Sequence, residues 1–268
     1  MEKKWTYINE PDPVLTASLA KAININGVLA GILVQRNIQD FDNAKRFFRP
    51  DSSHLYNPFL MKGMKQAVKR ILQAIEKKEK ILIYGDYDVD GTTAVSLVYH
   101  YLRRHYPLVE YYIPDRYSEG YGLSKKGVEF ALKHEFKLII TLDCGIKAHQ
   151  LVNYGNDKGL EFIICDHHLP SEEVPAALAV LDPKQSDCNY PFKELSGCGV
   201  GFKLIQALSQ KLVSEVDVYE YLDLVAVSIA SDIVPIIDEN RVLAYLGLKV
   251  LNSNPRPGLK ALIKSASL

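Results

Sequence analysis

Residues 81–93 read ILIYGDYDVDGTT: a short apolar run, three alternating carboxylates, a glycine and two threonines. This order predicts a buried strand, an acidic turn that carries Asp86, Asp88 and Asp90, and the start of a helix. Clustered carboxylates repel one another unless a cation lies among them, and a divalent metal ion is the simplest such cation. A lone Asp-Gly pair would be an ordinary solvated turn, whereas three aspartates directly after an apolar strand favour a metal site.

The composition limits the class of protein. The chain has 268 residues, of which 47% are hydrophobic, and this suits one large α/β domain, or one domain with an appendage. The formal net charge is zero, so a polyanionic partner has to be held by a local basic patch or by bound metal. The four cysteines form no Cys-x-x-Cys pair, which argues against a zinc finger and against a disulfide framework.

The cellular location follows from the same features. The N-terminal residues contain no apolar signal-peptide core, and no run reaches the roughly 18 apolar residues of a membrane span. Unpaired cysteines at the ends of apolar strands are typical of small buried thiols in a reducing compartment. We therefore expect a cytoplasmic protein that is not attached to a membrane.

Strands and helices alternate on both sides of the opening stretch. This alternation predicts an α/β fold, a doubly wound and mainly parallel sheet with helices on both faces. An N-terminal, mostly helical segment (1–58) precedes it, and the chain becomes helical again after Gly199. The strands are predicted at 81–85, 108–113, 137–142, 160–165 and 177–181, and the helices at 61–80, 92–104, 124–134, 147–158, 200–212, 216–230, 241–251 and from 258 onward.

Further metal-binding residue types follow two other predicted strands and one helix. Asp143 follows one strand, the triplet Asp166-His167-His168 follows another, and Asp232 lies at the end of the helix 216–230. Ligands of open α/β sheets bind beyond the carboxyl ends of the strands, so these groups are expected to meet there. Taken singly, each has an ordinary alternative as a helix cap, a packing histidine or a loop carboxylate.

Together these groups favour Mn²⁺ or Mg²⁺ over a metal held by thiolates. Carboxylates suit both ions, and the imidazoles favour Mn²⁺. The set exceeds what one ion needs beside its waters, so two ions about 3.5–4 Å apart, bridged by one carboxylate, fit it better. Such a pair binds a phosphate and activates water, which is the chemistry of phosphoester hydrolysis.

In these motifs the chain resembles the DHH phosphoesterase superfamily, whose name-giving triplet stands here as Asp166-His167-His168. Residues 86–91, DYDVDG, are similar to its first motif, and Asp143 and Asp232 lie in stretches similar to its second and fourth. The resemblance is strongest to the RecJ-like single-strand-specific DNA exonucleases. It spans nearly the whole chain, and it rests also on QRN at 35–37, on residues 51–58, on PDRY at 114–117, on EGYGL at 119–123 and on LSGCGVGFKL at 195–204.

The resemblance implies a role for each residue in a two-metal exonuclease that acts 5′→3′ in DNA repair and recombination. The implied metal ligands are Asp86, Asp88, Asp143, His167 and Asp232. Three further catalytic residues are implied: Asp90 ligates or orients, Asp166 holds a histidine tautomer, and His168 contacts the scissile phosphate. Residues 59–268 are then the DHH catalytic domain, with nothing that resembles the family's second, C-terminal domain. The implied partners are single-stranded DNA, a helicase and a single-strand-binding protein.

Two groups of residues are candidates for contact with the substrate. Arg116, Tyr117 and Tyr121 follow the strand 108–113, where an Arg suits a phosphate and a Tyr suits an unpaired base; a rim loop is the alternative. Ser196, Gly197 and Gly199 precede a helix, so their backbone N–H groups either face a phosphate or form a tight turn.

Two other functions remain open. A DHH enzyme that acts on short oligonucleotides, cyclic dinucleotides or pyrophosphate is less favoured, because such enzymes typically begin near the first motif. A non-catalytic scaffold that binds DNA would be expected to lack metal ligands, and all of the expected ligands are present.

Overall fold

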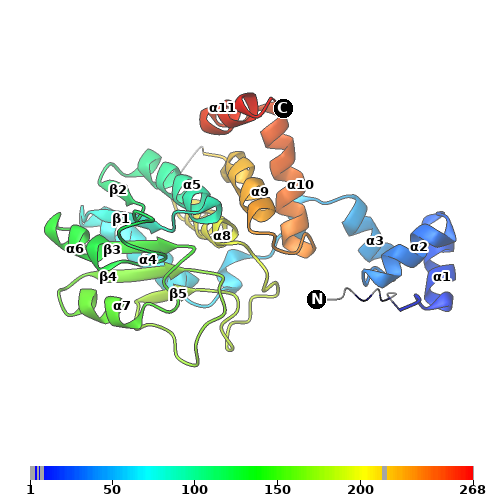
Figure 1. Ribbon diagram of the computed structural model, residues 1–268, viewed down its shortest axis with the longest axis horizontal. Helices are drawn as coiled ribbons and strands as arrows, with labels where there is room; N and C mark the ends of the chain where they lie inside the picture. Colours follow the sequence, from blue (N-terminus) through cyan, green and yellow to red (C-terminus); the bar gives the residue numbers. More distant parts are fainter. Residues whose placement is uncertain (1–3, 5, 7–8, 213–215, 268) are drawn as a thin grey trace. The chain divides into compact units, whose positions relative to one another are not determined.

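The computed structural model describes residues 4, 6, 9–212 and 216–267. The chain divides into two compact units, Met1–His54 and Leu55–Leu268. The boundary predicted from the sequence lies at residue 58. Each unit is described by itself, and Figure 1 shows the elements of both.

The first unit is helical and has a small core of its own. Asp12 and Asn26 cap the first two helices by accepting backbone N–H groups, and Asn24 ends the first one with a left-handed backbone (φ 54°). Leu19, Ala30 and Leu33 belong to the core of this unit. Its elements are α1 (Pro13–Ile23), α2 (Gly27–Gln35), α3 (Phe41–Phe48) and the short 3₁₀ helix η1 (Ser52–His54).

The second unit is built on a five-stranded sheet in which every pair of neighbours is parallel. The strand order is β2-β1-β3-β4-β5. The predicted α/β fold with a parallel sheet is therefore confirmed. The strands are β1 (Ile81–Gly85), β2 (Val109–Tyr112), β3 (Leu138–Leu142), β4 (Glu161–Cys165) and β5 (Ala179–Leu181).

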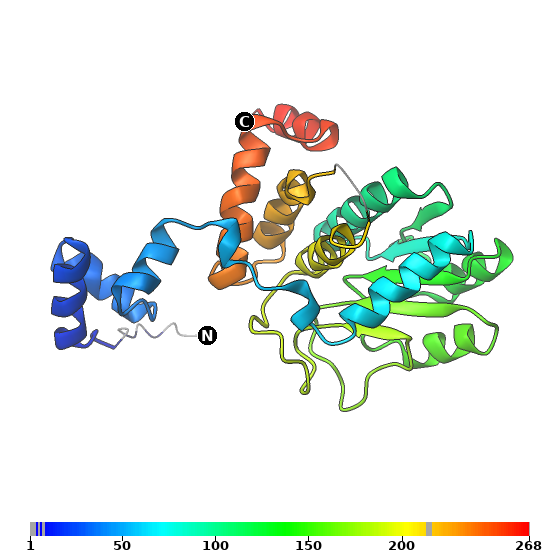
Figure 2. The same ribbon diagram turned by 180° about the vertical axis from the view of Figure 1, so that it is seen from behind.

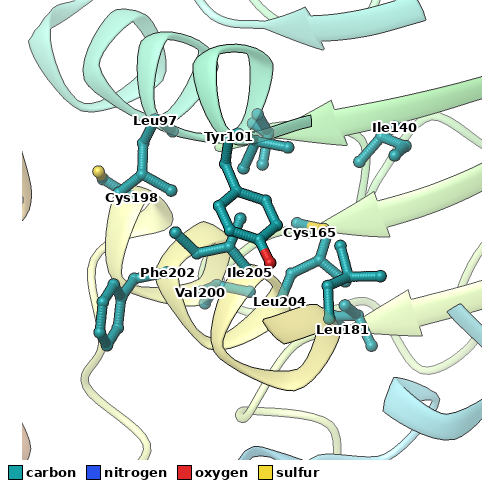
Figure 3. Close-up of a cluster of buried hydrophobic side chains, with 14 of the residues drawn as sticks. Leu97, Tyr101, Ile140, Cys165, Leu181, Cys198, Val200, Phe202, Leu204 and Ile205 are labelled. Carbon is teal, nitrogen blue, oxygen red and sulfur yellow. The ribbon is translucent and has the colours of Figure 1, made fainter. Parts of the chain in front are cut away.

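Helices cover both faces of the sheet, as a doubly wound fold requires (Figures 1 and 2). Ile81 and Ile83 of β1 pack with one set of helices, while Leu82 and Tyr84 pack with the other. Figure 3 shows the first face, where Tyr101 points from its helix toward Leu204 and Ile205. That face carries α4 (Met64–Glu76), α5 (Val89–His105) and α8 (Gly197–Ser209), and the opposite face carries α6 (Lys125–Lys133) and α7 (His149–Asn156).

The winding direction changes between β1 and β3. The crossover from β1 uses α5 on one face, whereas the crossovers to and from β3 use α6 and α7 on the other. In this strand order a crevice opens beyond the carboxyl ends of β1 and β3, which is the usual ligand site of such sheets. The second unit is completed by η2 (Pro58–Leu60), η3 (Val218–Tyr221), α9 (Leu222–Ser231), α10 (Asp238–Ser253) and α11 (Pro257–Ser265).

Two of the helices that begin earlier than predicted, α5 and α8, do so for the same physical reason. The side chain of Asp88 accepts the N–H of Gly91, so α5 begins at residue 89 and not at 92. Ser196 likewise accepts the N–H of Gly199, so α8 begins at residue 197 and not at 200. The side chain of the cap residue accepts a backbone N–H of the first turn that has no partner within the helix, so the helix can start directly after the cap. As a consequence Asp90 lies in the first turn of a helix and not in the preceding turn.

No single helix of the described residues has both the length and the apolar character that a membrane span needs. The pair α1 and α2 meets these criteria only when taken together, across a bend of 117°.

Candidate metal centre

His167, which follows β4, lies at the centre of a cluster of carboxylates. Its Nε2 atom is 3.1 Å from Oδ1 of Asp143, which follows β3. The same nitrogen is 3.6 Å from Oδ2 of Asp90 at the start of α5 and 3.6 Å from Oδ2 of Asp232 at the end of α9. Three of these four residues are buried, and Asp232 is partly accessible. The fold thus brings together two strand ends and two helix ends at the crevice between β1 and β3.

Asp143 and His167 are the least satisfied polar groups of this cluster. Within the described part of the chain, neither oxygen of Asp143 and neither ring nitrogen of His167 has a hydrogen-bond partner, although all four atoms are buried. Burial, together with the negative charges of Asp90 and Asp88, raises the pKa of Asp143 to about 10. A buried carboxylate and a buried imidazole in this condition are stabilised by a cation.

The donor set fits a divalent metal ion. Two groups of three side chains each have ligand atoms within 4.8 Å of one another: Asp143 with His167 and His168, and Asp90 with His167 and Asp232. Carboxylate oxygens with imidazole nitrogens are the ligands expected for Mn²⁺ or Mg²⁺. Since His167 belongs to both groups, they form one centre.

Asp166 holds His168 in place. Its Oδ1 atom lies 2.8 Å from Nδ1 of His168 and accepts the backbone N–H of His167 and of His168. Its Oδ2 atom accepts the backbone N–H of Ile146. Burial alone would raise the pKa of Asp166, but the hydrogen bonds from His168 and Ile146 outweigh it and lower this pKa. The contact with Asp166 in turn raises the pKa of His168.

Asp90 is held by the N-terminal end of α8. Its carboxylate accepts the backbone N–H of Gly197 (2.7 Å) and of Cys198 (2.8 Å) and the hydroxyl of Ser228 on α9 (2.7 Å). All of these groups are buried. Because α8 begins here, its backbone N–H groups and its dipole favour the negative charge of Asp90.

The segment Ser196–Gly199, which the sequence suggested for contact with a substrate phosphate, contacts the candidate metal centre. The N–H of Gly197 is bonded to Asp90, and the N–H of Gly199 is bonded to the hydroxyl of Ser196, which caps the helix. An added Cβ at Gly197 would lie 2.7 Å from Oδ1 of Asp143, so the backbone must approach the carboxylate closely. The predicted contact of Ser196, Gly197 and Gly199 with a substrate stays a prediction.

Asp86 and Asp88, the first two carboxylates of residues 81–93, lie at the same edge of the sheet. They accept hydrogen bonds from groups outside the cluster around His167. Asp86 is buried and accepts the backbone N–H of Tyr87 and of Gly122, while burial raises its pKa. Asp88 caps α5 with one oxygen and accepts the hydroxyl of Tyr121 (2.7 Å) with the other. Neither belongs to the two ligand groups described above, so their predicted role as metal ligands stays a prediction.

An aromatic and cationic rim borders this edge. The ring of Tyr121 meets the ring of Tyr87 edge to face at 5.3 Å, and the guanidinium of Arg116 lies 5.4 Å from the centre of the Tyr87 ring. Tyr117 is 95% exposed. The predicted contacts of Arg116, Tyr117 and Tyr121 with a substrate remain a prediction, and the structure places two of these side chains around Tyr87.

Two residues of the site were missed from the sequence. Asp182 follows β5 and is fully buried, and burial raises its pKa to about 7. The strand-end rule that identified Asp143 would have found it. Ser228 lies in the apolar helix α9, and a single serine in such a helix carries no signal of contact with Asp90.

Comparisons with known proteins identify close relatives. A family profile described as "DHH family, N-terminal domain" matches residues 80–229. The single-stranded-DNA-specific exonuclease RecJ of Bacillus subtilis (strain 168) is 44% identical over 97% of this chain and 32% of its own length. The RecJ of Escherichia coli (strain K12) is 35% identical over 77% of this chain and 38% of its own length.

Solved structures show the same fold. A crystal structure of exonuclease RecJ bound to manganese matches 76% of this chain and 52% of its own chain, with a TM-score of 0.69 and 32% identity. RecJ from Thermus thermophilus in complex with Mn²⁺ matches 96% of this chain and 36% of its own, with a TM-score of 0.80 and 26% identity. The chain thus spans less than half the length of the curated relatives described above.

Proposed function

Because the chain belongs to the DHH family, we propose that it is the catalytic part of a single-strand-specific DNA exonuclease that hydrolyses phosphodiester bonds with two Mn²⁺ or Mg²⁺ ions. The observation that carries this proposal is the buried pair Asp143 and His167. Their ligand atoms have no hydrogen-bond partner among the described residues and lie where ligands bind in doubly wound sheets. Residues 59–268 form the proposed catalytic domain.

Different residues of the chain have different proposed roles at the metal centre. Asp143 and His167 would hold the metal from the ends of β3 and β4, and Asp90 and Asp232 would hold it from the ends of α5 and α9. When bound, the ions activate water, polarise the phosphoryl oxygen and stabilise the leaving oxygen. His168, whose orientation Asp166 fixes, contacts the scissile phosphate or completes a metal shell.

The rim residues hold the strand. Arg116 suits a phosphate, and the exposed ring of Tyr117 suits an unpaired base. The 5′→3′ polarity and assistance by a helicase and by a single-strand-binding protein are proposed from the resemblance of the sequence motifs, and a cytoplasmic location is proposed from the composition.

The test uses single-stranded DNA labelled at either end, with Mn²⁺ or with a chelator. We expect mononucleotides to be released from the 5′ end in Mn²⁺ and no release in the chelator, in Asp143→Ala or in His167→Ala. Asp187→Ala is the control, because its carboxylate lies on the surface beside Lys62. The same assay is run on the longer natural chain if the chain continues beyond residue 268.

Three results would overturn the proposal. Cleavage that persists in the chelator would reject the metal mechanism. Preferential hydrolysis of dinucleotides or cyclic dinucleotides would favour an enzyme of short oligonucleotides. Tight DNA binding without cleavage, in the presence of Mn²⁺, would favour a scaffold.

A further inference from the structure

A groove of about 860 Å³ runs along the outer side of α4. It is bounded by α4, by the short helix η2 and by Lys211, which follows α8. In Figure 2 the outer side of α4 faces the viewer. None of the candidate metal ligands lines the groove, so it is separate from the site of the proposed reaction.

The floor of the groove is apolar. Val68 and Leu72 lie one turn apart on α4, and Phe59 and Leu60 belong to η2. Leu60 is 47% exposed, so its side chain is accessible from the solvent. Because the removal of apolar surface from water is favourable, this floor suits the apolar side chains of another molecule.

The rim of the groove is basic. Lys65, Lys69 and Lys211 line it and are exposed, and the ion pairs that lysines form among the described residues include none of the three. Lys65 and Lys69 are four residues apart on α4, so both project to the same side of the helix. Among the described residues that line the groove, Glu76 is the only acidic one, and it lies at the C-terminal end of α4. The positive charge is therefore concentrated at the other end.

We propose that this groove binds a short segment of a partner protein that carries both apolar and acidic side chains. The apolar side chains pack on the floor, and the carboxylates pair with Lys65 and Lys69. At 1.5 Å per residue, the stretch of α4 from Lys65 to Glu76 is about 16 Å long, which matches about three turns of an amphipathic helix. Because Glu76 repels carboxylates, the acidic side chains lie at the end nearer Lys65.

The apolar floor favours a protein over a nucleic acid as the partner. The lysines alone would suit phosphate groups as well, but phosphates gain nothing from contact with Leu60 or Leu72. The ring of Phe59 is half-buried, and Nζ of Lys211 lies 5.9 Å from its centre, so the ring is not open for a base to stack on it. A nucleic acid would therefore use the rim of the groove and leave the floor empty.

The experiment selects 12-residue peptides from a random displayed library on the unmodified full chain. Peptides that also bind the double variant Lys65→Glu, Lys69→Glu are removed. The affinity of the remaining peptides is then measured by fluorescence anisotropy for the unmodified chain, for Lys65→Glu and for Leu60→Ser. Both substitutions are at exposed positions, so the fold is expected to tolerate them.

Matched substitutions elsewhere serve as controls. Lys260→Glu reverses the charge of an exposed lysine in the first turn of α11, as Lys65→Glu does in the first turn of α4. Leu248→Ser replaces a leucine of α10 that is 51% exposed.

We expect the selected peptides to combine Asp or Glu with Leu, Phe or Trp at helical spacing. Lys65→Glu and Leu60→Ser should each weaken their binding by about tenfold or more, and the two controls should leave it unchanged. Added salt should weaken the binding, because the lysines are exposed. Mn²⁺-dependent DNA degradation should be the same in Lys65→Glu as in the unmodified chain.

Three results would overturn the inference. The first is a selection that yields no peptide able to distinguish the unmodified chain from the double variant, or only peptides without acidic residues. The second is an equal loss of affinity in the controls. The third is binding of a single-stranded oligonucleotide that Lys65→Glu weakens and Leu60→Ser does not, while the peptides fail to compete with it; the groove would then bind nucleic acid through its rim.

Discussion

Replacing Asp143 by asparagine should stabilise the metal-free protein while it abolishes metal binding. Asp143 is 1% exposed, and neither of its oxygens has a hydrogen-bond partner among the described residues. Burial and the neighbouring carboxylates raise its pKa from 3.8 to about 10. Asparagine has nearly the same shape and no charge, and its amide hydrogens can be donated to Asp90 or His167.

The magnitude follows from linkage between protonation and folding. In chelator at pH 7, folding must bring Asp143 into an environment where its charged form is disfavoured, which costs about 1.4 kcal/mol for each pH unit above 3.8. The cost is absent below the unfolded pKa, grows as the pH rises, and levels off near the folded pKa of about 10. At pH 7 it amounts to about 4 kcal/mol, and between pH 5 and pH 7 it changes by about 3 kcal/mol.

The assay is urea unfolding followed by circular dichroism, in chelator, at pH 5, 6 and 7. Asp143→Asn should be more stable than the unmodified protein at pH 7, and this advantage should shrink as the pH falls. Saturating Mn²⁺ should reverse the order, because only the unmodified protein gains stability from binding. Asp187→Asn, at an exposed salt bridge with Lys62, is the control. A variant that is less stable than the unmodified protein in chelator at pH 7, or an advantage that does not depend on pH, would refute this reasoning.

Three further substitutions test the surroundings of the site. Ser228→Ala removes a hydrogen bond to Asp90, so Mn²⁺ affinity measured by electron paramagnetic resonance should fall by about tenfold. Gly197→Ala places a methyl group 2.7 Å from Oδ1 of Asp143 and should abolish Mn²⁺ binding in the same titration. Tyr101→Phe removes a buried hydroxyl that has no partner among the residues described (Figure 3), and should raise the free energy of unfolding by about 1 kcal/mol in urea titrations.

Matched substitutions serve as controls for the first two. Ser231→Ala removes a hydroxyl from the same helix as Ser228, but one that donates to a backbone carbonyl. Gly258→Ala adds a methyl group where no atom lies within 4 Å. Equal losses of Mn²⁺ affinity in a variant and its control would show that the contacts of Ser228 and Gly197 with the candidate ligands do not determine Mn²⁺ affinity. A destabilised Tyr101→Phe would show that the hydroxyl has a partner.

The sheet was predictable because its signal is local. Strands such as 81–85 are continuous apolar runs bounded by turn residues, and the alternation with helices restricts the topology to a parallel sheet. The helix starts were placed too late at α5 and α8. Asp88 was interpreted as a ligand group and not also as a cap, and residues 196–199 were assigned to the turn before the helix. An N-cap can be recognised in the sequence only when the helix is taken to begin directly after the capping residue.

The proximity of Asp90, Asp143, His167 and Asp232 was predictable because the carboxyl ends of parallel strands meet at one edge. The contacts that hold Asp90 in place were not predictable. Asp90 and Gly197 are 107 residues apart in the sequence and meet only through the packing of α5 against α8. The sequence pattern of Ser196 to Gly199 is that of a helix N-terminus that suits an anion. The pattern correctly indicates an anion, and the structure shows that this anion is a side chain of the same protein.

The carboxylates of the centre therefore differ in how far the protein itself satisfies them. Asp90 and Asp166 accept several hydrogen bonds from backbone and side chains, which keep them oriented whether or not a metal ion is bound. Asp143, with His167 beside it, has no such partners among the residues that the structure describes. A site made only of the first kind would bind metal weakly, and one made only of the second kind would carry too much unpaired buried charge to fold. The division predicts that the loss of Asp143 lowers metal affinity most, while the loss of a contact to Asp90, as in Ser228→Ala, lowers it less.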